Sequence, residues 1–580
     1  MKNMKAKTFL LSLPLVFACL TGCNINNIVR PSSKPAESQG QGESSIEPAS
    51  SVGQKSSEQK ASSENKPSSQ PASSQGQASS ENKPSSQPAA SSEAPASSQA
   101  PVESSQPVAS SSEQGQSSDT PITGTVNVKF WHTFGQTVVD GLNAKINKFK
   151  QLVKDNDGVD VNIDLKYQGS YDDIAKKISD GFSVMNTPTI AVAYPDNVAD
   201  YIEIGKSAET EFVVNLDKYI SSNTVGFGVE SWLGDEEDED DFVEDFYREG
   251  SAYSIDGTYS LPFLKSTEIM FYNMDLLVEV MKGFKPEFNS SKYLIKEYMS
   301  RISWDDFISL CSYTKAHMSE ISNMLEVPMW YDSDANYIIT KMFQNNIPYT
   351  SITNENKGRI DFEDTEAFNG VVDLLDEARV NYANRLFTTK GIKNTYGSDF
   401  FTNEKCLFSI GSSGGSGYNF PQAEAFELGV CRVPAENNNP LYVSQGPTLT
   451  MFSDRGLTQA ENDAAQLYAW KFMKYITNGQ ANAEICINGS EGYVPVRYSA
   501  YETEFFQEFM EEGERYAMCY QVVVDDVNSS GGYLVSPAFK GSATLRDECG
   551  TMLTASLNAE NKAAISELVN RCINNTKLKM

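Results

Sequence analysis

The sequence predicts a mixed α/β protein whose globular part follows a long non-globular N-terminal region. Three observations support this fold class. Strand and helix patterns alternate between residues 126 and 194, as in parallel sheets that are covered by helices. A buried strand is predicted at 269–272 between a polar bend and a helix, which suits a crossing between two lobes or an ordinary interior strand. The segment 31–120, in contrast, contains no Leu, Met, Phe, Tyr or Trp.

The first residues have the pattern of an export signal. Lysines at positions 2, 5 and 7 precede an apolar run at 9–20, which is too short to span a bilayer. The run ends in Leu20-Thr21-Gly22-Cys23, which resembles a bacterial lipobox. We therefore expect 1–22 to be a lipoprotein signal peptide and Cys23 to be lipid-modified, which would anchor the protein at the extracellular face of the cell membrane. The alternative is a plain cleaved signal with Cys23 as an incidental thiol.

Residues 23–120 are predicted to form a disordered linker rich in Ser, Pro and Gln. Such a composition cannot bury enough apolar surface to offset the entropy lost on ordering. The sequence ASSENKPSSQPA occurs at 61–72 and again at 78–89, a repeat typical of low-complexity spacers. A flexible coil of this length has a root-mean-square reach of roughly 50 Å, which suits a tether between the membrane and a folded domain.

Charge and residue usage argue against several classes of function. The formal net charge is −30, from 47 basic and 77 acidic residues, which argues against a nucleic-acid partner. Seven cysteines follow Cys23 without any CxxC spacing, so buried free thiols are expected rather than a metal cluster. With two histidines and no HExxH motif, we predict no metal, no cofactor and no catalytic residues.

The beginning of the globular part is predicted to be a β-α-β-α-β unit. Its elements follow from alternation and helical periodicity, at 126–131, 138–153, 161–167, 172–182 and 189–194. Ligands bind beyond the carboxyl ends of such strands, so the candidate loops are 131–135, 169–171 and 194–197. Trp131 and His132 are either a stacking platform or an aromatic strand end packed into the core.

The stretch Tyr259–Leu277 lies near the middle of the globular part. It contains the predicted strand 269–272, and Asn273 and Asp275 have the residue types that begin a helix. Further along the chain, a strand is predicted at 406–410. A helix at 467–476 is expected to stop at Gly479, and a final helical region is predicted at 545–572.

Two loops have recognisable composition. The acidic run Asp235–Asp241 is predicted to be a solvated loop, since it does not match the spacing of a calcium-binding loop. The Gly/Ser-rich loop at 411–417 is either a cradle for an anion or for sugar hydroxyls, or a simple turn. It also matches G-x-S-x-G, but no histidine follows Ser413, so we set an esterase aside.

Several motifs occur in the order found in extracellular solute-binding proteins of ABC importers. They are Phe130-Trp131-His132-Thr133, Gln168-Gly169-Ser170-Tyr171-Asp172, Thr187-Pro188-Thr189-Ile190, Pro262-Phe263 with Ser266-Thr267 and Tyr272-Asn273, Ser412-Ser413-Gly414, Gln445-Gly446, Gly492-Tyr493-Val494-Pro495-Val496, and Gly541 with Arg546. Over 125–580 the chain resembles the maltose-binding-like class of this family, closest to the branch that binds glycerol 3-phosphate and sugars. The resemblance implies a periplasmic-binding-protein-like fold, in which two α/β lobes close by a hinge motion around a ligand.

The resemblance also implies lobe boundaries and site residues. Lobe one would comprise 124–268 and 435–482, and lobe two 270–430 and 485–580. A glutamate of the family pattern is replaced by Pro195 with Asp196 beside it, and a Trp-rich segment is reduced to Trp330-Tyr331. The implied ligand-binding residues are Tyr171, Asp196, Ser266, Trp330, Ser413, Gly446, Tyr493 and Arg546.

The candidate side chains suit a sugar, a polyol or a phosphate. Tyr171, Trp330 and Tyr493 offer aromatic faces, and Asp196 can accept hydrogen bonds from hydroxyl groups. Arg546 could pair with a phosphate through two parallel hydrogen bonds. It could equally form a structural salt bridge with one of the many acids.

The resemblance implies a binding protein rather than an enzyme. The expected role is capture of a carbohydrate or glycerol-phosphate-type solute in the cleft between the lobes, followed by delivery to an ABC permease in the membrane. We expect a monomer. One alternative is an extracellular glycoside hydrolase, because paired carboxylates are available among 77 acidic residues. The other is a surface adhesion or scaffold lipoprotein, suggested by the serine-rich stalk.

Overall fold

A computed structural model describes residues 124–580 except 235, 237, 424, 437–438, 490 and 528–531. The predicted signal peptide, Cys23 and the predicted linker at 23–120 lie outside the described residues, as do two residues of the acidic run. Among the residues that are described, no helix combines the length and the apolar composition needed to cross a membrane. Within the same ranges, no group of three or more His, Cys, Asp or Glu side chains is placed to hold a metal ion.

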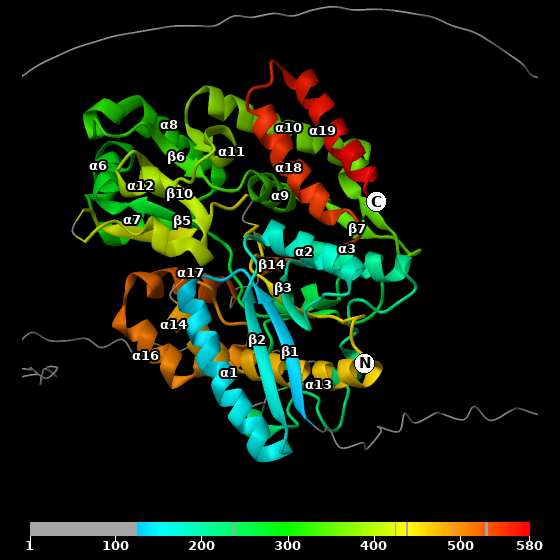
Figure 1. The fold of residues 1–580 in the computed structure, drawn as a ribbon. Helices are drawn as coiled ribbons and strands as arrows, with labels where there is room; N and C mark the ends of the chain where they lie inside the picture. The colour runs from blue at the N-terminus through cyan, green and yellow to red at the C-terminus, as the bar shows by residue number, and fades with distance from the viewer. Residues whose placement is uncertain are drawn as a thin grey trace, which may run out of the picture. The chain divides into compact units, whose positions relative to one another are not determined.

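Two five-stranded sheets organise the described chain (Figure 1). The first sheet has the order β2-β1-β3-β13-β4 and consists of β1 (Thr125–His132), β2 (Asp160–Tyr167), β3 (Ile190–Ala193), β4 (Ser260–Pro262) and β13 (Thr448–Met451). The second has the order β11-β5-β10-β6-β9 and consists of β5 (Glu268–Asn273), β6 (Val327–Tyr331), β9 (Phe387–Thr389), β10 (Cys406–Ser412) and β11 (Leu428–Arg432). We call each sheet with the helices packed on it the first and the second lobe.

Smaller elements and helices complete the fold. Two small sheets pair β7 (Thr350–Ile352) with β8 (Gly358–Ile360) and β12 (Tyr442–Val443) with β14 (Tyr533–Leu534). The longer helices are α1 (Gln136–Asp157), α2 (Tyr171–Val184), α3 (Pro195–Ser207), α6 (Met274–Phe284), α7 (Lys292–Met299), α8 (Trp304–Ile321), α9 (Asp334–Gln344), α10 (Thr365–Ala383), α13 (Gln459–Thr477), α14 (Gly479–Gly489), α16 (Glu504–Glu512), α17 (Arg515–Val527), α18 (Ser542–Ser556) and α19 (Lys562–Lys577). The short ones are α4 (Asp217–Ile220), α5 (Glu244–Arg248), α11 (Lys390–Lys393), α12 (Ser398–Thr402), α15 (Tyr498–Glu502), η1 (Ser231–Leu233), η2 (Glu239–Asp241), η3 (Glu249–Ser251), η4 (Pro286–Phe288), η5 (Asp361–Glu363) and η6 (Ser413–Asn419).

The predicted β-α-β-α-β unit is confirmed in the first lobe. The strands β1, β2 and β3 are parallel, and α1 and α2 connect them. Helices α1 and α13 pack together over the sheet, because Phe472 of α13 contacts both Phe149 of α1 and Phe130 of β1, at ring distances of 5.1 and 6.2 Å. The sequence analysis did not predict the antiparallel strands β13 and β4, which extend the sheet beyond β3.

The second sheet is covered by helices on both faces. Phe307 of α8 packs on Phe408 of β10, and Phe401 of α12 packs against Phe271 of β5 on the opposite face. All six residues of β5 are therefore buried, which explains why this strand is a continuous apolar run rather than an alternating one. The predicted helix start is confirmed, since the Asn273 side chain accepts a hydrogen bond from the Leu276 amide at 3.0 Å.

Segments that cross between the lobes pair with one another. The chain leaves β4 at Pro262 and enters β5 at Glu268. Within this crossing, Ser266 exchanges two backbone hydrogen bonds with Gln445 on the return segment, at 3.0 and 2.8 Å. Lys265 pairs in the same way with Val494. The chain therefore passes from the first sheet to the second within Tyr259–Leu277, and β5 is also a buried interior strand, so both alternatives stated for this stretch describe it.

Other local predictions need correction or detail. Helix α13 ends at Thr477 as expected, but Gly479 begins α14 instead of capping α13, and the Asn478 side chain accepts from the Ala481 amide at 2.7 Å. The final helical region consists of the two helices α18 and α19. The seven described cysteines are all free and buried, as expected.

Candidate functional site

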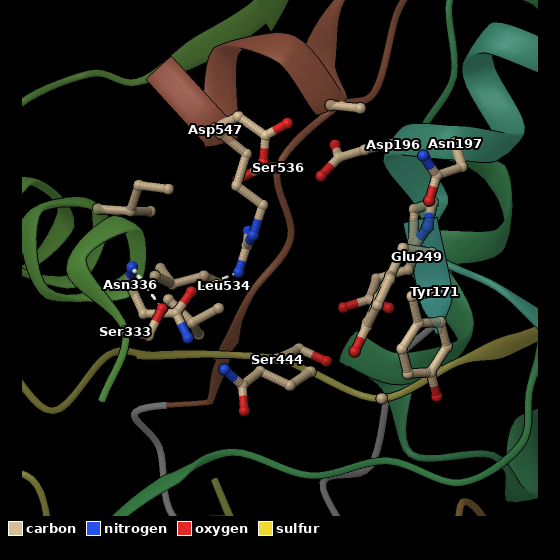
Figure 2. Close-up of a pocket in the computed structure, with 18 of the residues that line it drawn as sticks. Tyr171, Asp196, Asn197, Glu249, Ser333, Asn336, Ser444, Leu534, Ser536 and Asp547 are labelled. Atoms are coloured by element: carbon tan, nitrogen blue, oxygen red, sulfur yellow. Dashed lines mark hydrogen bonds between the residues drawn. The ribbon is translucent and has the colours of Figure 1, made fainter. Parts of the chain in front are cut away.

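A cavity of about 320 Å³ lies where helix N-termini and crossing segments of both lobes meet (Figure 2). Figure 2 shows Asp196 and Tyr171 on one side of it, and Ser333 and Asn336 on the other. The lining residues are Tyr171, Asp172, Tyr194, Pro195, Asp196, Asn197, Glu249, Lys265, Ser333, Asn336, Ile339, Tyr349, Val443, Ser444, Gln445, Gly446, Leu534, Ser536, Ala543, Arg546 and Asp547. Its volume falls at the small end of the range typical of ligand sites.

Strand ends and helix starts position the lining side chains. Strand β3 leads into α3 at Tyr194, and β6 is followed within a few residues by α9, so both lobes contribute the carboxyl ends of strands. Ser170 caps α2 reciprocally with Asp173, which fixes the start of the helix at Tyr171. Ser333 caps α9 by accepting from the Asn336 amide at 3.2 Å.

Acidic side chains outnumber basic ones around the cavity. The acids are Asp172, Asp196, Glu249 and Asp547, and the bases are Lys265 and Arg546. Glu249 and Lys265 form a buried ion pair at 2.7 Å, and Lys265 Nζ also donates to the Gly446 carbonyl at 3.3 Å. The remaining groups leave a formal excess of negative charge.

Arg546 faces Asp196 without forming an ion pair. Its guanidinium donates a hydrogen bond to Asn336 Oδ1, and within the described ranges no carboxylate lies within 4.0 Å of it. Burial raises the pKa of Asp196, and the charge of Arg546 opposes that rise. The structural salt bridge that was one of the two expectations for Arg546 is therefore not formed.

Two polar atoms at the cavity have no hydrogen-bond partner among the described residues. They are Ser444 Oγ and Gln445 Oε1, both buried. Buried polar atoms are nearly always paired, and each exception needs a partner such as a ligand or water. The cavity therefore offers both donors and acceptors to a hydroxyl-rich molecule.

The structure brings four of the predicted site residues together. Tyr171, Asp196, Gly446 and Arg546 line the cavity. Gly446 has a φ of +88°, and a Cβ at this position would lie 2.1 Å from the Leu264 carbonyl oxygen, so only glycine lets the two crossing segments approach this closely.

The other predicted residues do not line the cavity. The Ser266 hydroxyl accepts from Ser412 Oγ at 3.3 Å, and Ser413 Oγ accepts from the Thr267 amide at 3.3 Å. Their hydroxyls therefore join the Gly/Ser-rich loop to the crossing. Tyr493 packs edge-on against Phe134 at a ring distance of 6.3 Å.

Trp330 belongs to the core of the second lobe. It is fully buried in β6 and packs on Phe400 of the loop helix α12, at a ring distance of 4.3 Å. The expectation that Trp330 offers an aromatic face in this cavity therefore needs correction.

Trp131 and His132, at the end of β1, are also buried. This agrees with the expectation of an aromatic strand end packed into the core. Burial lowers the pKa of His132 to about 4.

Sequence reasoning missed several lining residues. Ser333 could have been predicted from the sequence, because a serine shortly after a buried strand is a typical residue to begin a helix. Asn336 then lies in the first turn of that helix, three residues after Ser333. Glu249 has no such signal, because it lies in the short turn η3 and reaches the cavity through its ion pair with Lys265.

Comparison with known proteins gives one family and one fold. The model of the family described as bacterial extracellular solute-binding protein matches residues 145–511. No curated protein matches this chain. Among solved structures, a cyclic α-maltosyl-1,6-maltose binding protein from Arthrobacter globiformis aligns over 78% of this chain and 100% of its own, with 17% identity and a TM-score of 0.55.

Two further structures share the fold. The GacH receptor of Streptomyces glaucescens, solved unliganded and with acarbose, aligns over 78% of this chain and 98% of its own, with 14% identity and a TM-score of 0.54. UgpB from Mycobacterium tuberculosis, in complex with glycerophosphocholine, aligns over 78% of this chain and 98% of its own, with 13% identity and a TM-score of 0.53. The matching family is one of solute-binding proteins, so the chain is a binding protein rather than an enzyme. The chain belongs to the bacterial extracellular solute-binding proteins.

Proposed function

We propose that the protein captures a neutral carbohydrate in this cavity and delivers it to the permease of an ABC importer in the membrane. The observation that carries the proposal is the polar cavity between the lobes, with unpartnered hydroxyl and amide groups and an excess of carboxylates. Carboxylates and amides accept from and donate to sugar hydroxyls. Two of the similar structures are named for carbohydrate ligands, which supports the same class of solute.

We assign the contacts within the cavity as follows. Asp196 accepts hydrogen bonds from solute hydroxyls, Arg546 donates to them, and Tyr171 packs a ring against the solute. Ser266 and Ser413 lie behind this layer and hold the crossing in place. Tyr493 lies outside the lining of the cavity and packs edge-on against Phe134.

Closure of the cavity needs a hinge, which we place at the paired crossings. Their hydrogen bonds join Lys265 to Val494 and Ser266 to Gln445. On this basis lobe one comprises 124–268 and 435–482, and lobe two comprises 270–430 and 485–580. A lipid on Cys23 and the linker 23–120 would keep the binding protein, acting as a monomer, near its permease.

A glycerol-phosphate-type solute is the second candidate, and Arg546 is the observation that favours it. An arginine without a carboxylate partner is suited to a phosphate. The acids around it oppose this, because Asp196, Asp172 and Asp547 would all repel a phosphate anion. We therefore rank the neutral carbohydrate first.

Thermal unfolding against a solute panel tests the proposed function. The panel contains mono- and oligosaccharides, glycerol 3-phosphate and glycerophosphodiesters. A solute present at a hundred times its dissociation constant should stabilise the protein by about 2.7 kcal/mol, and we expect this from a carbohydrate. Selective stabilisation by a phosphate would favour the second candidate, and silence across the panel would favour another solute class or the scaffold alternative.

Two substitutions test the assigned contacts. Asp196→Asn should weaken binding of the selected carbohydrate by roughly 10- to 150-fold, since a hydrogen bond to a charged group contributes about 1.5–3 kcal/mol. Calorimetric titration measures the affinity, and Asp140→Asn, at an exposed position on α1, is the matched control.

Arg546→Gln should weaken the binding of a phosphate solute far more than the binding of a neutral sugar. Unchanged affinity in both variants would remove the assigned site.

A further inference from the structure

A second hollow, of about 470 Å³, lies on the second lobe at the edge strand β9. It shares no lining residue with the cavity described above. The residues that line it are Glu326, Val327, Trp330, Tyr382, Ala383, Arg385, Phe387, Thr388, Lys393 and Phe400. The hollow is therefore lined by Trp330, which was predicted as a ligand-binding residue but does not line the main cavity.

Trp330 and Thr388 form the floor of this hollow. They are register partners on the parallel strands β6 and β9, so their side chains project from the same face of the sheet. Phe387, the preceding residue of β9, packs on Tyr337 of the opposite face. Phe400 lies against the ring of Trp330 and forms one wall.

Two buried donors in the hollow have no hydrogen-bond partner among the described residues. They are the Trp330 indole Nε1 and the Thr388 hydroxyl, and both residues are almost completely buried. An indole N–H can only donate, and a hydroxyl can donate as well. Buried polar atoms seldom remain unpaired, so the pair calls for an acceptor from outside the chain.

Two cations flank these donors. Arg385, in the turn after α10, and Lys393, at the end of α11, are exposed and form no ion pair within the described part of the chain. The one acid of the hollow, Glu326, is paired with Lys405 at 2.9 Å. In a chain with a net charge of −30, two cations without an ion pair that line one hollow make a local positive site.

Two carbonyl groups at the end of α10 accept hydrogen bonds within the following turn. The Tyr382 carbonyl accepts from the Arg385 amide at 2.8 Å, and the Asn381 carbonyl accepts from the Leu386 amide at 3.1 Å.

We propose that this hollow binds a small organic anion, a carboxylate or a phosphate on a compact apolar body. Its oxygens would accept from the Trp330 indole and the Thr388 hydroxyl, and Arg385 and Lys393 would balance its charge. Phe400 and Tyr382 would contact the apolar body. The proposal is independent of the solute proposed for the main cavity.

Calorimetric titration of the purified full-length protein with benzoate and phenyl phosphate tests this site. Benzamide, which has a similar shape but no charge, is the control ligand. We expect the anions to bind and benzamide not to bind. The double variant Arg385→Gln, Lys393→Gln should weaken anion binding roughly tenfold or more, and Thr388→Val should weaken it while keeping the shape of the side chain. The preference between benzoate and phenyl phosphate identifies the anionic group.

Two further variants make the outcome specific. Lys148→Gln with Lys166→Gln removes the same charge from exposed positions of the first lobe and should leave anion binding unchanged. Arg546→Gln should also leave it unchanged, because Arg546 lies in the main cavity. Failure of both anions to bind, equal binding of benzamide, equal loss in the charge control or loss in Arg546→Gln would each overturn the proposal.

Discussion

Replacing Trp330 by alanine is expected to destabilise the protein by about 3–5 kcal/mol, the range for deleting a large aromatic side chain from a core. Trp330 is fully buried and packs on Phe400 between β6 and α12. Its removal would leave a cavity that the surrounding helices and strands cannot fill by collapse. Urea-induced unfolding measures the loss. Affinity for the main-cavity solute should be unchanged in the folded fraction, because Trp330 does not line that cavity.

Two comparison variants separate packing from polar contacts. Trp330→Phe retains most of the apolar volume and removes an indole N–H that has no partner among the described residues, so its effect on stability should be much smaller. Tyr418→Ala removes an aromatic side chain that is 81% exposed and should leave stability nearly unchanged. An alanine variant at position 330 that kept its stability but lost solute binding would instead place Trp330 in the main site.

The contrast between Trp330 and Tyr171 shows where prediction from the sequence ends. A strand buried on both faces has no alternating pattern, so residues 327–331 do not indicate on which face of the sheet the Trp330 side chain lies. That depends on α12, which lies far along the chain and supplies Phe400. Tyr171, by comparison, follows a parallel strand and a helix cap, and both signals are local.

The assembly of the cavity was predictable only in part. The strand ends near Tyr171 and Asp196 follow from the β-α-β-α-β pattern, whereas Arg546 was implied only by the family resemblance. Glu249 and Asn336 enter the site through contacts with Lys265 and Arg546. Such contacts join segments that are distant in sequence, and single-sequence patterns carry no information about them.

Buried charged groups gather behind the cavity, at the crossing between the lobes. Lys265 pairs with Glu249, and the nearby Glu268 accepts a hydrogen bond from the Tyr331 hydroxyl at 2.5 Å. Removing one member of a buried pair is costly, although the pair itself contributes little net stability. We infer that these groups define the geometry of the crossing more than they stabilise it. Of the three, Glu268 has a pKa that burial raises to about 7, so its protonation should affect unfolding as the pH approaches neutrality.

Glu268→Gln is expected to stabilise the protein by up to about 3 kcal/mol at pH 8 and to have little effect at pH 5. Burial raises the pKa of Glu268 from its ordinary value of 4.5 to about 7, against the opposing effects of the Tyr331 hydroxyl and the charge of Arg546. The folded state therefore keeps a proton that the unfolded state loses between these two pKa values. Stability falls as the pH rises through this window, and one pKa unit corresponds to about 1.4 kcal/mol.

Glutamine imitates the protonated carboxyl group, so the variant should lack this part of the pH dependence. Other buried acids, such as Asp526 with a pKa raised to about 7, contribute equally to both proteins, and the difference between variant and wild type isolates Glu268. Urea unfolding at pH 5, 6, 7 and 8 would measure it, with the exposed Glu320→Gln as the control. A constant difference at all four pH values would mean that Glu268 is already ionised in the fold, held by Arg546, and that the crossing carries a stable carboxylate rather than a proton.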